Sequence, residues 1–147
     1  MSIDAAIQAL EAKGIAIDTN PASVRAKSRD FFWYSPVLKD RLDHVIADFV
    51  ATPTSEAEVI EILRTCFAED VPVTTRGTGT GNYGQAMPLS GGCVLHLNKM
   101  DRVKEIHPGR VICEPGVLLK DLDAACNETG QENRMYSSNW ATATNGC

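Results

Sequence analysis

Residues 71–84 read Val-Pro-Val-Thr-Thr-Arg-Gly-Thr-Gly-Thr-Gly-Asn-Tyr-Gly, and this stretch is the most informative part of the sequence about the fold. Its first part, residues 71–75, has the β-branched composition of a strand, with Pro72 near the start, where proline is tolerated. The loop that follows carries four glycines within eight residues, at Gly77, Gly79, Gly81 and Gly84. Glycine loses more conformational entropy on folding than any other residue, so this density requires a reason. Backbone N–H groups converging on an anion, with threonine hydroxyls and Arg76 beside them, would supply one.

The order of elements around the loop excludes two common phosphate-binding motifs. Rossmann and P-loop glycines lead from a strand directly into a helix, and a P-loop also needs a lysine. Here residues 82–88 lead through a further turn to an apolar run at 93–97, which predicts another strand, and the lysine is absent. The glycines alone therefore leave a second interpretation open, which is a wide turn between two strands.

Upstream of the loop the sequence predicts a strand–helix–strand unit with a parallel pair of strands. The strands are expected at 45–50 and 71–75, and Ser55 with Glu58 forms a capping box between them. The helix that begins there has a stripe of apolar residues typical of a helix lying on a sheet. The stripe consists of Val59, Ile62, Leu63, Cys66 and Phe67.

The remaining patterns complete an α+β fold. Short strands are expected at 103–107 and 111–114, and an amphipathic helix at 118–128 ends before Gly130. We expect the antiparallel part of the structure to begin near Cys93. At the N-terminus, helices are expected at 4–13 and 22–30, followed by a loop over residues 30–36.

Composition excludes several classes of function. The chain has 147 residues, enough for one domain with its own core, and a net charge of −5 argues against a nucleic-acid partner. No apolar run is long enough to span a membrane, and no secretory signal is evident. The five cysteines include no CxxC pair, so we expect buried thiols, no metal site and a cytoplasmic location.

The order of these motifs resembles that in a known family. The motifs are the capped helix, the Val-Pro-Val strand, the Arg-Gly-Thr-Gly-Thr loop, Glu-Pro-Gly-Val at 114–117 and Ala-Thr-Ala-Thr-x-Gly at 141–146. It is the FAD-linked oxidase family, also called the vanillyl-alcohol oxidase or PCMH-type family, and the similarity is greatest to its D-lactate and glycolate dehydrogenase-like branch. The resemblance implies an N-terminal helical extension at 1–42. It also implies a PCMH-type FAD-binding domain at 43–147, incomplete at its C-terminus. Such an N-terminal fragment holds a first subdomain, with a small βαβ sheet and helices, and the start of a second, antiparallel subdomain.

The resemblance also implies which residues would bind FAD. The glycine-rich loop would cradle the pyrophosphate, Pro115-Gly116 would form a turn beside the cofactor, and the last motif would face the pyrophosphate and the flavin ring. Without the family context, Pro115-Gly116 is equally well explained as an ordinary turn between a strand and a helix. The implied FAD-binding residues are Arg76, Gly77, Thr78, Gly79, Thr80, Gly81, Gly84, Gln85, Pro115, Gly116, Ser138, Thr144 and Gly146.

The chain departs from the family pattern in two places. Ser137, Asn145 and Cys147 stand where the family usually has proline, an apolar residue and a second glycine. In covalently flavinylated relatives a loop histidine is bonded to the flavin, and Thr80 occupies that position here. We therefore expect FAD to be held noncovalently.

Three functions remain open at this point. In the first, the chain is the FAD-binding portion of an oxidoreductase whose intact parent oxidises a small 2-hydroxy acid. In the second, it is a non-catalytic FAD- or nucleotide-binding module. In the third, it is an inactive truncated remnant. No residue stands out as a catalytic base, and we expect the isolated chain to be inactive. The oligomeric state is not predicted.

Overall fold

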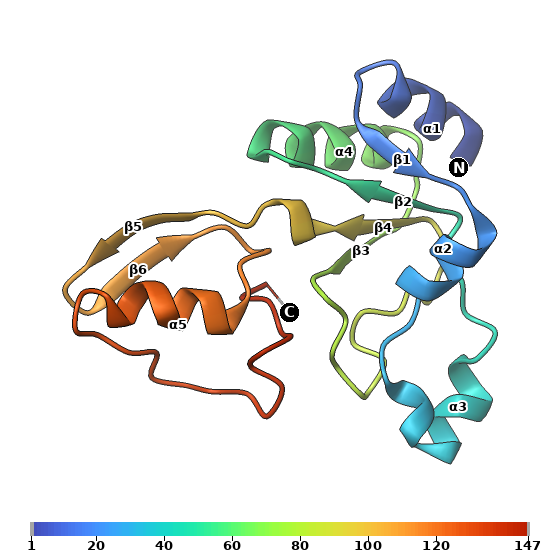
Figure 1. Cartoon of the computed structure of the whole chain (residues 1–147). Coiled ribbons are helices and arrows are strands. Elements are labelled where there is room, and N and C mark those ends of the chain that lie inside the picture. Colours follow the sequence, from blue (N-terminus) through green and yellow to red (C-terminus); the bar gives the residue numbers. More distant parts are fainter. Residues whose placement is uncertain (1, 147) are drawn as a thin grey trace.

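The structure, a computed structural model, describes residues 2–146; Met1 and Cys147 lie outside the described residues. Two layers of structure follow one another along the chain (Figure 1). The first is a four-stranded sheet with helices on both of its faces, and the second is a two-stranded hairpin with one helix. The predicted α+β fold is confirmed.

The four-stranded sheet has the order β1-β2-β4-β3. Its strands are β1 (Ala16–Asp18), β2 (Phe49–Thr52), β3 (Val73–Arg76) and β4 (Cys93–His96). β4 is parallel to both β2 and β3 and lies between them, whereas β1 pairs antiparallel with the outer edge of β2. The predicted strand–helix–strand unit is therefore present, but its two strands are not neighbours. The expectation that the antiparallel part begins near Cys93 is wrong, because Cys93 lies in a central parallel strand.

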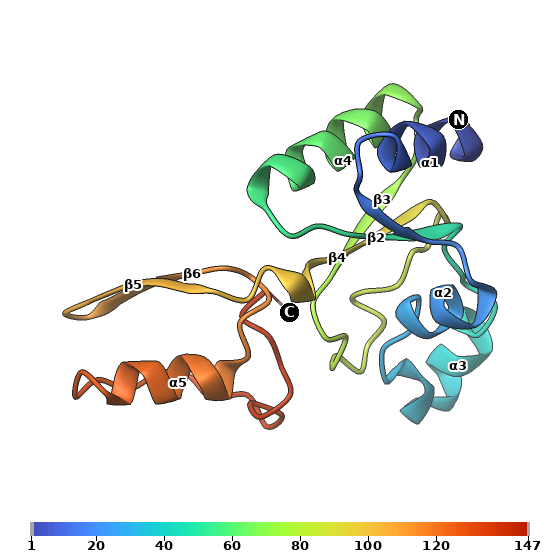
Figure 2. The ribbon, with the colours of Figure 1, turned by 45° about the horizontal axis from the view of Figure 1, so that its top comes forward.

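Strand residues alternate between two apolar layers, as the pleat of a sheet requires. Phe49, Ala51, Cys93 and Leu95 face the larger core, which also receives α1 (Ile3–Glu11) and α4 (Glu56–Ala68). Val50 and Val94 face the other side and pack with Val24 of α2 (Pro21–Lys27). Figure 2 shows α1 and α4 lying together on one side of the sheet and α2 on the other.

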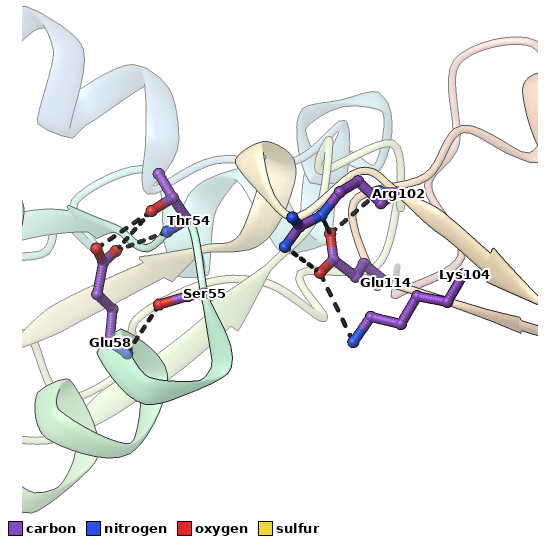
Figure 3. A network of polar contacts seen from close by, with 6 residues as sticks. All are labelled: Thr54, Ser55, Glu58, Arg102, Lys104 and Glu114. Atoms are coloured by element: carbon purple, nitrogen blue, oxygen red, sulfur yellow. Dashed lines mark hydrogen bonds and ion pairs between the residues drawn. The ribbon is translucent and has the colours of Figure 1, made fainter.

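Helix α4 begins where the sequence places it. The Ser55 hydroxyl accepts the Glu58 N–H (3.3 Å), and the Glu58 carboxylate in turn accepts the Thr54 N–H (2.7 Å; Figure 3). The predicted apolar stripe is only partly right. Ile62 and Cys66 are fully buried, but Phe67 is 89% exposed, because α4 packs on one side only and nothing covers the flank that carries Phe67.

The N-terminal region holds more structure than the sequence predicts. β1, a 3₁₀ turn η1 (Phe32–Tyr34) and α3 (Pro36–Leu42) were not expected, and α2 ends at Lys27 rather than at residue 30. β2 begins at Phe49 rather than at Val45. The residues before it bond to other segments instead: the Ala47 N–H donates to the Ser28 hydroxyl (2.9 Å), and the Asp48 carboxylate accepts the Gly92 N–H (2.6 Å).

The second part of the fold begins after a 3₁₀ turn, η2 (Leu97–Lys99). The antiparallel strands β5 (Val103–His107) and β6 (Arg110–Cys113) form a hairpin, and α5 (Leu119–Asn127) packs beside it. Leu122 and Cys126 are the buried residues of α5. Within residues 2–146, no helix has the length and apolarity needed to cross a membrane.

Candidate functional site

A cavity of about 860 Å³ lies between the glycine-rich loop and the C-terminal segment. Its walls come from residues 75–86, from the start of α5 and from residues 133–146. Nine of the predicted binding residues line it: Arg76, Gly77, Gly79, Thr80, Gly81, Gln85, Ser138, Thr144 and Gly146. Thr78, Gly84, Pro115 and Gly116 are not among the lining residues.

The glycine-rich loop is supported from within by the Arg76 side chain. Arg76 is buried, and its guanidinium donates through Nη1 to the Arg29 carbonyl (2.5 Å) and through Nη2 to the Thr78 carbonyl (3.2 Å). Gly79 has a positive φ of +73°, and a Cβ there would overlap this guanidinium. The missing side chain at Gly79 therefore makes room for Arg76 in addition to leaving its backbone open to the cavity. Gly84 also has a positive φ, +79°, whereas Gly77 and Gly81 are not in the positive-φ region.

Asp30 supports the same loop from outside, and sequence reasoning missed it. Its buried carboxylate accepts the Phe32 N–H through Oδ1 (2.8 Å) and the N–H groups of Gly84 (2.8 Å) and Gln85 (3.1 Å) through Oδ2. The amides of Gly84 and Gln85 are therefore directed toward Asp30. An aspartate bonding the amide two residues ahead is a recognisable turn signal, but its partners 54 and 55 residues away are not readable from the sequence.

Pro115-Gly116 holds the back of the cavity. The Gly116 N–H donates to the Met100 carbonyl (2.7 Å), and a Cβ at Gly116 would overlap the Leu97 carbonyl oxygen. The Pro115 carbonyl accepts the Gly146 N–H (2.7 Å), so this turn positions a lining residue without lining the cavity itself.

An ion-pair group fixes the strand end just before this turn. The buried Glu114 carboxylate accepts Arg102 Nη2 (2.9 Å) and Nε (3.2 Å) and lies 3.7 Å from Lys104 Nζ (Figure 3). The hydrogen bonds from Arg102 hold the pKa of Glu114 below its usual value. Glu114 thereby joins both strands of the hairpin at the point from which Pro115-Gly116 departs.

The C-terminal wall is tied to the loop and to α5. The Asn139 side-chain amide donates to the Thr80 carbonyl (3.2 Å), which bridges the two walls. Asp123 of α5 accepts the Asn133 N–H (3.1 Å) and the Tyr136 hydroxyl (2.7 Å). The bond to Asp123 raises the pKa of Tyr136 to about 12.

His96, at the end of β4, lies beneath the loop rather than in the cavity wall. Burial, together with the positive charges of Lys27 and Arg76, lowers the pKa of His96 to about 4. The imidazole is thus neutral at physiological pH and serves as a packed support of the loop. In the part of the chain from residue 2 to residue 146, no three His, Cys, Asp or Glu side chains are grouped as metal ligands would be.

The lining groups suit an elongated ligand with a phosphate-bearing part and a flat apolar part. Arg76, Thr80 and the loop backbone provide donors, and Arg134 adds a second cation. Leu119, Leu122 and Met135 provide apolar surface in the same cavity. The volume is within the usual range for cofactor pockets, and the residues present fit FAD.

Comparison with known proteins gives the same family. Residues 47–146 match the family described as FAD binding domain. An uncharacterized FAD-linked oxidoreductase of Mycobacterium tuberculosis is 34% identical over 100 residues, which cover 67% of this chain and 22% of that protein. A D-lactate dehydrogenase of Archaeoglobus fulgidus is 40% identical over 82 residues, covering 55% of this chain and 18% of that protein. The chain thus spans about a fifth of the length of these relatives.

Solved structures agree on the fold. An alkyldihydroxyacetonephosphate synthase superposes with a TM-score of 0.81 at 13% identity, over 99% of this chain and 31% of that one. A p-cresol methylhydroxylase superposes with a TM-score of 0.75 at 20% identity, over 94% of this chain and 27% of that one. The chain belongs to the FAD-binding domain family of the FAD-linked oxidoreductases.

Proposed function

We propose that this chain holds FAD noncovalently in the cavity, as the cofactor-binding portion of an oxidoreductase that acts on a small 2-hydroxy acid. One observation carries the proposal: two sequence motifs more than fifty residues apart, in the loop 76–81 and in the segment 144–146, line one cavity. The similarity to a D-lactate dehydrogenase supports the substrate class.

Within this proposal the residues of the chain bind and orient the cofactor. The loop amides would face the pyrophosphate and Thr80 would add a hydroxyl, while the Arg76 guanidinium, bonded beneath the loop, would hold it in place and add positive charge nearby. The apolar residues of α5 cover part of the flavin. Bound FAD would supply the capacity to accept a hydride, and the residues of this chain would hold and orient it. None of the lining residues is assigned as a catalytic base, and substrate binding is assigned to the remainder of a longer parent.

A non-catalytic FAD-binding module is the second candidate. It is favoured by the state of Asp30, the buried carboxylate in the cavity wall, because three backbone amides already engage it. Both candidates require FAD binding, so they share one first test.

Titration of the purified chain with FAD, followed by quenching of flavin fluorescence, tests the proposal. We expect weak, saturable binding of FAD and much weaker binding of riboflavin, which lacks the pyrophosphate. Equal binding of both flavins, or none, would refute the pyrophosphate assignment.

The noncovalent attachment has its own test. Acid precipitation of the FAD-loaded chain should release all yellow colour into the supernatant, because the Thr80 hydroxyl replaces the histidine that forms the covalent bond in other members. Fluorescence that stays with the protein band on a denaturing gel would contradict this.

A further inference from the structure

A short N-terminal segment, residues 29–32, contacts the glycine-rich loop at three separate points. The Arg29 carbonyl accepts the buried Arg76 guanidinium (2.5 Å), and the Phe31 N–H donates to the Gly81 carbonyl (2.8 Å). The Asp30 carboxylate accepts the N–H groups of Gly84 and Gln85. The segment therefore forms hydrogen bonds with the beginning, the middle and the end of the loop.

This segment is itself firmly placed. Phe32 is fully buried, and the Arg29 guanidinium lies 4.9 Å from its ring centroid while pairing with Asp43 (2.6 Å). Ser28 is also fully buried and accepts the Ala47 N–H, which ties the segment to the residues just before β2. These contacts hold the segment, and through it the loop, in place next to the four-stranded sheet.

Asp30 is the central group because it is a carboxylate in the wall of a cavity that suits an anion. An uncompensated carboxylate there would repel a pyrophosphate, but both oxygens of Asp30 accept N–H groups of the protein. Bonds to a charged acceptor are stronger than neutral ones, and a loop with four glycines has much conformational freedom to lose. If the loop is already fixed before the ligand arrives, less conformational entropy is lost on binding.

We infer that Asp30 is a positioning residue that sets the glycine-rich loop in its cofactor-binding conformation before FAD arrives. The inference rests on the proposed binding of FAD. It makes the N-terminal extension part of the cofactor site, although no residue of that extension belongs to the glycine-rich motif.

The test compares Asp30→Asn with Asp48→Asn in the full 147-residue chain. Asp30→Asn keeps the shape of the side chain, but one acceptor oxygen becomes an N–H donor that must face either Phe32 N–H or the amides of Gly84 and Gln85. Asp48→Asn is the matched control, because Asp48 also accepts a loop amide, that of Gly92 (2.6 Å), and does not line the cavity. Two readouts are measured: amide hydrogen exchange without ligand, and the Kd for FAD.

For Asp30→Asn we expect exchange at Gly84 and Gln85 to accelerate about ten-fold or more and the Kd for FAD to rise by a similar factor. Exchange in β2 and β4 should stay unchanged, which separates a local effect from global destabilisation. Asp48→Asn should leave both loop exchange and Kd at the wild-type values.

Unchanged loop exchange in Asp30→Asn overturns the inference, and so does faster exchange with an unchanged Kd. If Asp30→Asn does not fold, Asp30→Glu is measured in the same way; it keeps the charge but shifts the oxygens by a methylene, and unchanged values in it overturn the inference. A wild-type chain that binds no FAD overturns the proposed function and, with it, the role of Asp30 in cofactor binding. Loop exchange in the variants then still shows whether Asp30 orders the loop.

Discussion

At the scale of single residues, the loop glycines serve the protein's own packing as much as a ligand. Gly79 leaves space that the Arg76 guanidinium occupies, and a Cβ at Gly81 would lie 2.7 Å from Gln85 Oε1. Arg76 in turn reaches the Arg29 carbonyl. The high glycine content of such a loop therefore reflects the space that neighbouring side chains of the protein need, as well as the space that an anion would need.

Gly79→Ala tests that support directly. The substitution forces a positive φ on alanine, which costs about 1–2 kcal/mol, and displaces the buried guanidinium, which adds about 1–3 kcal/mol. We expect the free energy of unfolding, measured by urea denaturation, to fall by about 2–5 kcal/mol.

Gly109→Ala is the control for Gly79→Ala. Gly109 has nearly the same φ, +72°, and a Cβ added there would meet no atom within 4 Å, so only the backbone strain should appear. Equal losses in the two variants would show that Arg76 is not displaced.

His96 gives the protein a pH-dependent stability. Its pKa is lowered to about 4 in the folded state and is near 6.5 when unfolded, so the unfolded chain binds more protons between these values. Stability should therefore fall as the pH drops from 6.5 toward 4, by up to about 3 kcal/mol. The carboxylates with lowered pKa, such as Glu114, add their own losses only below their unfolded values, near pH 4.5.

Proton NMR of the imidazole Cε1–H measures this pKa. We expect the His96 signal to begin to shift only below about pH 5. A midpoint between about pH 6 and 7, the range of a solvated imidazole, would mean that the ring does not support the loop.

At the level of elements, the turn at Pro115-Gly116 is one of the places where the two parts of the fold meet. Gly116 packs against the carbonyls of Leu97 and Met100, and the strand-like contacts that follow it link α5 to the C-terminal segment. Among them are the bonds from Leu119 N–H to the Ala143 carbonyl (2.9 Å) and from Asn145 N–H to the Val117 carbonyl (2.8 Å). Loss of this turn should therefore loosen the end of the C-terminal wall, residues 143–146, which depends on these bonds.

Gly116→Ala should loosen that wall more than it destabilises the sheet. A Cβ 2.7 Å from the Met100 carbonyl oxygen breaks the Gly116–Met100 bond, and we expect rapid amide exchange at Leu119, Asn145 and Gly146 with β2 and β4 still protected. Gly130→Ala, where a Cβ meets nothing within 4 Å, should leave these amides as they are. Slow exchange at Gly146 in Gly116→Ala would argue against the link.

Many of the helices and strands could be predicted from the sequence, because their signals lie within the segments themselves. Strand and helix periods located β3, β5, β6, α4 and α5, and Ser55 marked the start of α4. What failed depends on distant partners. The insertion of β4 between β2 and β3, the exposure of Phe67 and the role of Asp30 are all decided by segments far away in the chain.

At the scale of the whole molecule, the cavity has two walls from this chain and is open elsewhere to solvent. A pyrophosphate site alone gives modest affinity, since a flavin ring must also be buried to bind tightly. We therefore expect weak FAD binding and no reduction of a dye acceptor by the chain with D-lactate or glycolate. Turnover above that of a Gly79→Val control would contradict this.

In the proposed complex, the loop and the C-terminal segment together hold the FAD pyrophosphate. Amide NMR of the ¹⁵N-labelled chain during titration with FAD tests it most directly. We expect shifts concentrated at residues 77–81 and 144–146, with the amides of Gly84 and Gln85 still protected by Asp30. Shifts confined to other surfaces, or no shifts at millimolar FAD, would contradict it.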